Sequence, residues 1–122
     1  MDYQDLRESI VEYAKRMYEE KLVSATSGNI SIRLPDRSDA FAITPSSERY
    51  ATMTGERIVI MTIDGKLLDC PASARPSSEW RLHAELYRHK ETVHAVCHTH
   101  SPYATAWASL REAIPLVLAE IG

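Results

Sequence analysis

RIVIMTIDGKLLD, Arg57 to Asp69, contains the clearest strand in the chain together with the turn that reverses it. Its first half, RIVIMTI, is rich in the β-branched and apolar residues that are typical of strands. DGK, at 64–66, is a turn signal, and LLD begins a returning strand. The segment therefore predicts a hairpin, and with it a sheet in which neighbouring strands run antiparallel.

A second hairpin is predicted upstream. NISIR, at 29–33, alternates with Ile30 and Ile32 on one face, and AFAIT, at 40–44, is expected to be its returning strand. The intervening RLPDRSD, at 33–39, carries the proline, aspartate and serine typical of a loop.

Two amphipathic helices flank these hairpins in the sequence. The first is predicted from Asp2 to about Leu22, where apolar residues recur at spacings of three and four. The second is predicted over EWRLHAELYRHK, 79–90, after Ser77 and Ser78, which are good N-cap residues. The residues expected to face the core are Leu6, Ile10, Tyr13, Ala14, Met17 and Tyr18 in the first helix, and Leu82, Leu86 and Tyr87 (or His83) in the second.

The remaining sequence alternates strand, helix and strand. TVHAVCHTH, at 92–100, is predicted as a strand, Ser101-Pro102 as a helix start, and IPLVLAEIG, at 114–122, as the beginning of another strand. This order predicts an α/β protein, one layered domain over 1–122 with a mainly antiparallel sheet. Because the sequence stops where a strand starts, we expect the domain to be C-terminally incomplete.

Composition narrows the function classes. A chain of 122 residues with 44% hydrophobic and 25% charged residues is long enough for one domain with a core. The net charge of −3 and the lack of a basic run argue against nucleic acid as a partner. The start, MDYQDLRESI, resembles neither a signal nor a transit peptide, and no stretch has the length of a membrane span. Cys70 and Cys97 do not form a metal-binding CxxC pair, so a reducing cytoplasm is the simplest setting.

The strand at 92–100 carries the most informative side chains. His98 and His100 share a face because side chains alternate along a strand, and they lie roughly 7 Å apart along it. Two imidazoles at that spacing can converge on one divalent ion. The alternative is a pair of half-exposed, hydrogen-bonded histidines. His94 shares their parity but lies too far back, and with Cys97 it is expected to be a packing residue.

Two histidines do not complete a zinc site, since a catalytic zinc takes three protein ligands and an open position. His83 and His89 lie on the preceding helix, where a core-edge and a surface role are expected for them. The site is then completed by a carboxylate or by residues beyond Gly122. Glu79 is the carboxylate of interest because its helix leads into the histidine strand, although an acidic residue in a first helical turn is also favoured by the helix dipole.

Three loops rich in hydroxyl and backbone donors could hold an anion. They are TSGN (26–29), TPSS (44–47) and RPSSE (75–79), and the last ends at a helix N-terminus, where free N–H groups favour phosphate. Gly28 would let a ligand approach the backbone, and Asn29 has an amide able to donate. Taken singly, each loop is more readily explained by turn and capping chemistry, and their joint presence with a histidine pair is what favours an anion site.

TSGNISIR, AITPSS, SSEWRLHAELYRH and AVCHTHSPYATAWA, in this order, resemble the class II aldolase/adducin family, most of all its fuculose-phosphate aldolases and ribulose-phosphate 4-epimerases. The resemblance covers the chain from the first helix to Gly122. It implies an α/β/α fold around a central antiparallel sheet, a homotetramer with active sites between subunits, a catalytic Zn²⁺ and a small sugar-phosphate substrate.

The resemblance also assigns roles to single residues. His98 and His100 match the two zinc histidines, and Glu79 matches the catalytic acid/base. The phosphate-binding loops are matched by Gly28 and Asn29, Ser46 and Ser47, and Ser77 and Ser78, with Thr26 a weaker contact.

The chain departs from the family pattern in three places. The family often has glycine where Ser47 stands, its third zinc histidine lies in a segment beyond residue 122, and a catalytic tyrosine of the fuculose-phosphate enzymes finds no match near Ala119. These departures leave the substrate open.

The implied reaction is zinc-dependent retro-aldol cleavage of a ketose 1-phosphate to dihydroxyacetone phosphate and an aldehyde. Zinc would stabilise the enediolate, and Glu79 would move the proton, helped if a dry site raised its pKa. The alternatives are a pentulose-phosphate 4-epimerase, a sugar-phosphate dehydratase or decarboxylase, and an adducin-like interaction module without chemistry. The 122-residue form by itself is expected to be impaired, because it lacks the third ligand.

Overall fold

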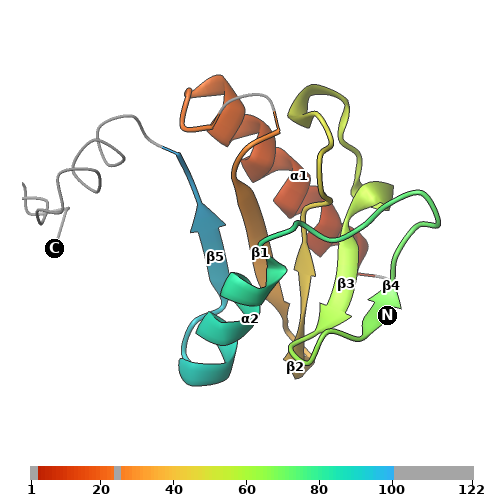
Figure 1. The fold of residues 1–122 in the computed structure, drawn as a ribbon, viewed down its shortest axis with the longest axis vertical. Coiled ribbons are helices and arrows are strands. Elements are labelled where there is room, and N and C mark those ends of the chain that lie inside the picture. The colour runs from red at the N-terminus through yellow and green to blue at the C-terminus, as the bar shows by residue number, and fades with distance from the viewer. Residues whose placement is uncertain (1–2, 24–25, 101–122) are drawn as a thin grey trace, which may run out of the picture.

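The computed structural model describes residues 3–23 and 26–100. In this part of the chain five strands form one sheet in the order β4-β3-β2-β1-β5, and every neighbouring pair is antiparallel (Figure 1). Two α-helices and two short 3-10 helices accompany the sheet. The elements are α1 (Gln4–Glu19), β1 (Asn29–Leu34), β2 (Arg37–Ile43), the 3-10 helices η1 (Tyr50–Thr52) and η2 (Gly55–Arg57), β3 (Val59–Thr62), β4 (Leu67–Asp69), α2 (Trp80–His89) and β5 (Ala95–His98).

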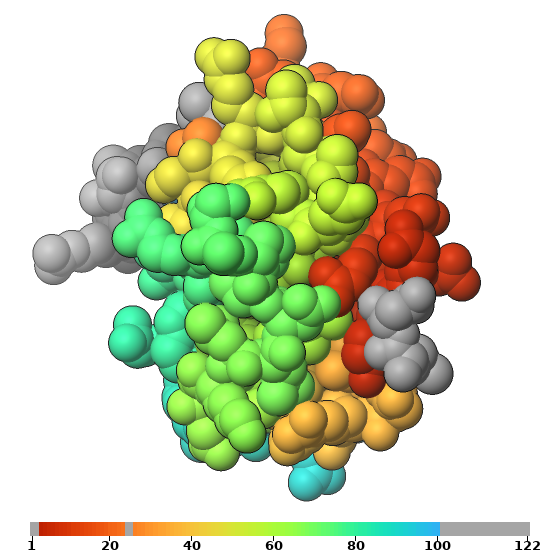
Figure 2. Space-filling view, turned by 90° about the vertical axis from the view of Figure 1, so that its right-hand side faces the viewer, coloured from red at the N-terminus to blue at the C-terminus, as the bar shows by residue number. Residues whose placement is uncertain are grey.

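The two α-helices cover opposite faces of the sheet, so the fold has the expected α/β/α layers (Figure 1). Strand alternation produces this division, because successive side chains point to opposite faces. In β2, for example, Ala40 and Ala42 pack towards α1, whereas Phe41 and Ile43 pack towards α2. Figure 2 views the molecule from the β4 side, with the β3–β4 segment between α1 (red) and the start of α2 (teal).

The hairpin of β1 and β2 is tighter than the sequence predicts. The expected loop at 33–39 shrinks to a two-residue turn, because β1 continues to Leu34 and β2 already begins at Arg37. Leu34 is almost fully buried in the cluster under α1. Burial of this side chain outweighs the loop-forming tendency of the polar residues around it.

The second helix also differs from its prediction. Its N-cap is Glu79 rather than Ser77 or Ser78, although the Ser77 hydroxyl accepts a hydrogen bond of 3.3 Å from the Glu79 N–H. Leu82, expected in the core, is about half exposed, whereas His83 is completely buried. The helix is rotated so that His83, Ala84 and Tyr87 face the sheet.

The first helix buries a narrower stripe than expected. Ile10, Ala14 and Met17 are buried as predicted, but Tyr13 and Tyr18 are about half exposed. Neither α-helix within residues 3–23 and 26–100 combines the length and the apolar character that crossing a bilayer requires. The helix expected after Ser101-Pro102 and the strand expected at 114–122 lie outside the described residues.

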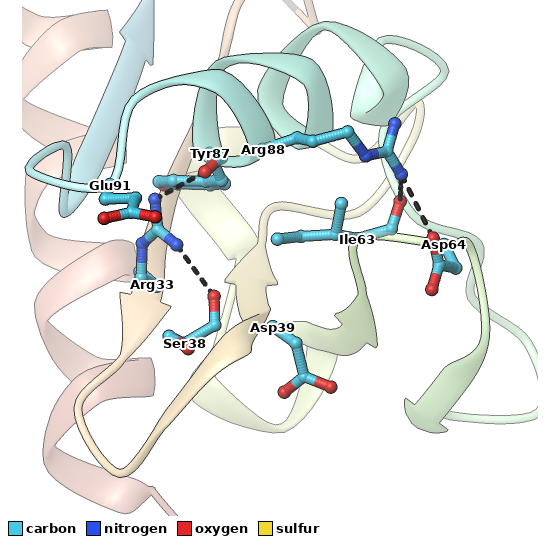
Figure 3. A pocket seen from close by; sticks show the side chains of 8 residues that line it. All are labelled: Arg33, Ser38, Asp39, Ile63, Asp64, Tyr87, Arg88 and Glu91. Atoms are coloured by element: carbon cyan, nitrogen blue, oxygen red, sulfur yellow. Dashed lines mark hydrogen bonds and ion pairs between the residues drawn. The ribbon is translucent and has the colours of Figure 1, made fainter.

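Arg33, near the end of β1, connects this strand to the layer that contains α2. The residue lies on the α2 face and is 7% exposed, and its guanidinium donates to the backbone carbonyls of Ser38, Tyr87, Lys90 and Val93 at 2.7–3.1 Å. It also stacks 4.7 Å from the centre of the Tyr87 ring. Figure 3 shows the contacts of Arg33 with Ser38 and Tyr87, three of the residues that line a cleft on this side of the sheet. The arginine therefore joins the β1–β2 hairpin, α2 and the segment before β5.

Candidate active site

The histidine strand lies beside β1, and the pairing brings His98 opposite Asn29. Both side chains belong to the α2 face, because Asn29 shares its parity along β1 with Ser31, which contacts α2. α2 begins immediately after Glu79. Strand register and helix placement therefore bring together three residues that are 29, 79 and 98 in the sequence.

Glu79, His98 and His100 form a compact group of potential metal ligands. One ligand atom from each lies within 4.8 Å of the other two. The rings of His98 and His100 have their centres 4.9 Å apart, and His98 Nδ1 touches the Glu79 carboxylate. His100 lies beyond the end of β5, held by a 2.8 Å hydrogen bond from its N–H to the carbonyl of Leu22.

This group suits a divalent ion such as Zn²⁺. Two imidazole nitrogens and a carboxylate oxygen are ligands that zinc prefers. His98 Nδ1 is buried and makes no regular hydrogen bond, although the Glu79 oxygen lies against it. Buried polar atoms are normally paired, and a shared cation would satisfy both groups.

The other histidines and Cys97 do not join the group. His89 is exposed and bonded to Glu85, in agreement with a surface role. The expectation that His94 is a packing residue is wrong, because the residue is exposed just before β5, which is the edge strand of the described sheet. Cys97, on β5, is exposed as a whole residue, but its thiol lies 3.0 Å from the sulfur of the buried Met17, in partial agreement with the packing role expected for it.

Glu79 is held in its ionised form. Its carboxylate accepts a 2.9 Å hydrogen bond from the side-chain amide of Asn29. This hydrogen bond, with a smaller contribution from His98, lowers the pKa of Glu79 and outweighs the partial burial that would raise it. The condition that a dry site raises the pKa of Glu79 is therefore not met, because the hydrogen bond from Asn29 outweighs partial burial.

A chain of buried polar residues behind Asn29 was not expected from the sequence. The carbonyl of Asn29 contacts His83 Nε2, His83 Nδ1 lies 2.6 Å from the Ser31 hydroxyl, and that hydroxyl lies 2.7 Å from the Tyr87 hydroxyl. Parity along NISIR places Ser31 on the face of Asn29, which was an available signal. The sequence also offered His83 as a core-facing alternative in the second helix, but it gave no sign of the contact between His83 and Asn29.

The three hydroxyl-rich loops meet beside this group. Thr44, in the second loop, is bonded on both sides. Its N–H donates to Ile30, the residue after the first loop, and its carbonyl accepts from the Ser77 N–H in the third loop. Ser46 donates its N–H to Arg75, so the backbone donors of Ser46 and Ser77 are already engaged within the protein. The expected phosphate-loop residues otherwise differ in accessibility: Thr26, Ser47 and Ser78 are exposed, Gly28 and Ser46 are half-buried, and Asn29 and Ser77 are buried.

The backbone explains why glycine suits the position of Ser47. Ser47 has φ 60°, in the left-handed region that glycine adopts at little cost. Serine at this place bears a steric cost that a glycine would not.

Gly28 is required by its surroundings, and Gly28→Ala is expected to destabilise the protein by at least about 2 kcal/mol. Its φ is 79°, and an added Cβ would lie 2.3 Å from Val23 Cγ1 and 2.9 Å from the carbonyl oxygen of His98. The measurement is the thermal midpoint of the full-length variant. Gly55→Ala, where the nearest contact would be an ordinary 3.4 Å, is the matched control, and equal shifts for both variants would contradict this account.

The sequence of the chain matches a known protein family and several of its members. The sequence profile described as "Class II Aldolase and Adducin N-terminal domain" matches residues 8–121. The chain is 40% identical to 5-deoxy-D-ribulose 1-phosphate aldolase of Bacillus thuringiensis serovar kurstaki over 91% of its own length and 51% of that protein. It is 43% identical to methylthioribulose-1-phosphate dehydratase of Sorangium cellulosum over 79% of its own length and 44% of that protein.

Comparison with solved structures supports the same family. A solved L-fuculose 1-phosphate aldolase superposes with a TM-score of 0.85 at 33% identity, covering 92% of this chain and 51% of that one. The chain thus spans about half the length of the relatives it matches. The matched profile and the layered antiparallel fold together place this chain in the class II aldolase and adducin N-terminal domain family.

Proposed function

We propose that the full-length protein containing this chain is a zinc-dependent aldolase that cleaves a small ketose 1-phosphate to dihydroxyacetone phosphate and an aldehyde. The convergence of Glu79, His98 and His100 beside three hydroxyl-rich loops carries this proposal. The relatives support the substrate class, since they are named for reactions of ketose 1-phosphates. Residues 1–122 form the N-terminal part of a single domain in this proposal.

We assign a role in this reaction to each residue of the candidate site. His98 and His100 hold the ion, and a third protein ligand comes from beyond residue 122. Bound Zn²⁺ supplies a Lewis acid for the ketose oxygens. Glu79 transfers the proton at the reacting carbon, and its ionised state suits the base half of that role. Thr26, Gly28, Asn29, Ser46, Ser47, Ser77 and Ser78 surround the phosphate.

The setting of the reaction is part of the proposal. We place the enzyme in a reducing cytoplasm, which fits the free thiols of Cys70 and Cys97. We also propose a homotetramer with active sites between subunits, as the family resemblance implies. The exposed positions of His100 and Ser78 leave room for a neighbouring subunit to cover the site.

The proposal is tested by zinc analysis and product assays on the purified full-length protein. We expect about one zinc per chain and release of dihydroxyacetone phosphate from L-fuculose 1-phosphate or 5-deoxyribulose 1-phosphate. His98→Ala should lose both properties, whereas His89→Gln, an exposed histidine of α2, should keep both. A protein with neither zinc nor turnover would instead be an interaction module of the adducin type.

A dehydratase is the second candidate, favoured by the 43% identity to methylthioribulose-1-phosphate dehydratase. Such an enzyme would remove water from its ketose 1-phosphate and release no dihydroxyacetone phosphate. The same assay with methylthioribulose 1-phosphate separates the two, because only an aldolase splits the carbon chain.

A further inference from the structure

Five polar residues, from the half-buried Glu79 to four buried residues behind it, form one continuous series of hydrogen bonds across the layer between β1 and α2. In order they are Glu79, Asn29, His83, Ser31 and Tyr87. Ser31 and His83 are 0% exposed, Tyr87 is 1% exposed and Asn29 is 4% exposed. In such a place each group depends on its protein neighbours for hydrogen bonds.

Donor chemistry gives this chain a direction. The side-chain nitrogen of Asn29 lies 2.9 Å from a Glu79 oxygen and donates to it, so the carbonyl of the same amide is directed at His83. The carbonyl of Asn29 needs a donor, so Nε2 of His83 carries the proton. A neutral imidazole then has an acceptor at Nδ1, which receives the Ser31 hydroxyl proton, and Ser31 in turn accepts from Tyr87.

The surroundings keep His83 and Tyr87 in the protonation states that this direction requires. Burial lowers the pKa of His83 to about 4, so the imidazole stays neutral at physiological pH. Burial also raises the pKa of Tyr87 to about 12, so its hydroxyl keeps the proton that it donates. The Tyr87 ring is packed against the guanidinium of Arg33, 4.7 Å from the ring centre, which anchors the far end.

We propose that His83 is a positioning residue for the acid/base Glu79, acting through Asn29 at the end of a head-to-tail hydrogen-bond chain that starts at Tyr87. This rests on the proposed function of Glu79. The chain locks the Asn29 amide in the orientation that presents an N–H to the carboxylate. To reverse the direction of these hydrogen bonds, the Asn29 amide would have to flip and the His83 proton would have to move from Nε2 to Nδ1. Because both changes are needed together, the Asn29 N–H stays directed at Glu79 and holds its carboxylate in one place.

The first test reads the tautomer of His83 without using activity. In the full-length protein labelled with ¹⁵N-histidine, and assigned with a His83→Gln variant, we expect the Nε2–H tautomer at neutral pH. Observation of the Nδ1–H tautomer would overturn the proposal, because the chain would then run in the opposite direction. This result holds or fails whether or not the protein proves to be an aldolase.

The second test is kinetic and uses the substrate that gives turnover. His83→Leu should lower kcat roughly 10- to 100-fold with KM and zinc content nearly unchanged, and His83→Gln, which keeps a donor towards Asn29, should recover part of the loss. His89→Gln, on an exposed turn of the same helix, should change neither constant. A rise in KM at constant kcat would contradict positioning of the acid/base.

A double-mutant cycle separates positioning from general loss of structure. In a Glu79→Gln background, His83→Leu should cause little further loss of kcat, because the group it positions is already gone. A full additional loss in that background would overturn the proposal. An inactive wild-type protein that still shows the Nε2–H tautomer would contradict the proposed function and leave the chain of hydrogen bonds standing.

Discussion

Glu79→Gln is expected to lower the turnover of the full-length enzyme by roughly a hundred- to ten-thousand-fold, the usual contribution of a positioned acid/base. Glutamine has nearly the same shape and can still accept the hydrogen bond from Asn29, so the local structure should survive. It cannot take up a proton, so proton transfer at the reacting carbon fails. The measurement is kcat on the substrate that the wild-type protein cleaves.

Two controls make this result specific to Glu79. Zinc content is measured alongside kcat, because Glu79 lies among the potential ligands and we expect the histidines to retain the ion. Glu85→Gln removes an exposed carboxylate of α2, which is paired with Arg88, and this change should leave kcat unchanged. Unaltered turnover in Glu79→Gln would remove Glu79 from the mechanism.

Arg33→Ala is expected to destabilise the protein by about 3–5 kcal/mol. The substitution leaves four backbone carbonyls without their charged donor and empties the space above the Tyr87 ring. Because those carbonyls belong to β2, the end of α2 and the segment before β5, loss of the arginine contacts loosens three parts of the structure together. The thermal midpoint of the full-length protein should fall by roughly 10 °C or more.

Arg37→Ala provides the matched comparison for this prediction. Arg37 lies in the same hairpin, but it is exposed and paired with the exposed Asp39. Exposed ion pairs contribute little, so the midpoint should shift by about 2 °C or less. A comparable shift for both arginines would contradict the role assigned to the buried contacts of Arg33.

Local patterns in the sequence were sufficient for most of the fold. Alternation along NISIR correctly separated Ile30 and Ile32, which pack under α1, from the residues on the other face. The DGK turn and the order of helices and strands predicted the antiparallel layers. These features depend on neighbours a few residues apart, and a periodic pattern records such neighbours directly.

The candidate site was recoverable from sequence only in part. His98 and His100 were identifiable from strand parity, and Glu79 from its helix and from the likeness to a family. The two histidines remain proposed metal ligands, and Glu79 remains the proposed acid/base. The lowered pKa of Glu79 was not predictable, since it depends on a hydrogen bond from Asn29, 50 residues away. Burial of Arg33 likewise contradicts the usual exposure of arginine, whereas burial of His83 agrees with the core-edge role expected for it.

Composition, periodicity and motif order by themselves determined the class of fold and the residues worth testing. Tertiary structure alone decided which of those residues touch, because the register of β5 on β1 sets His98 opposite Asn29, and the rotation of α2 turns His83 rather than Leu82 towards the sheet. Both choices follow from how whole faces pack. A shift of one strand residue or one helical position would change every contact in the site while leaving the local sequence pattern the same.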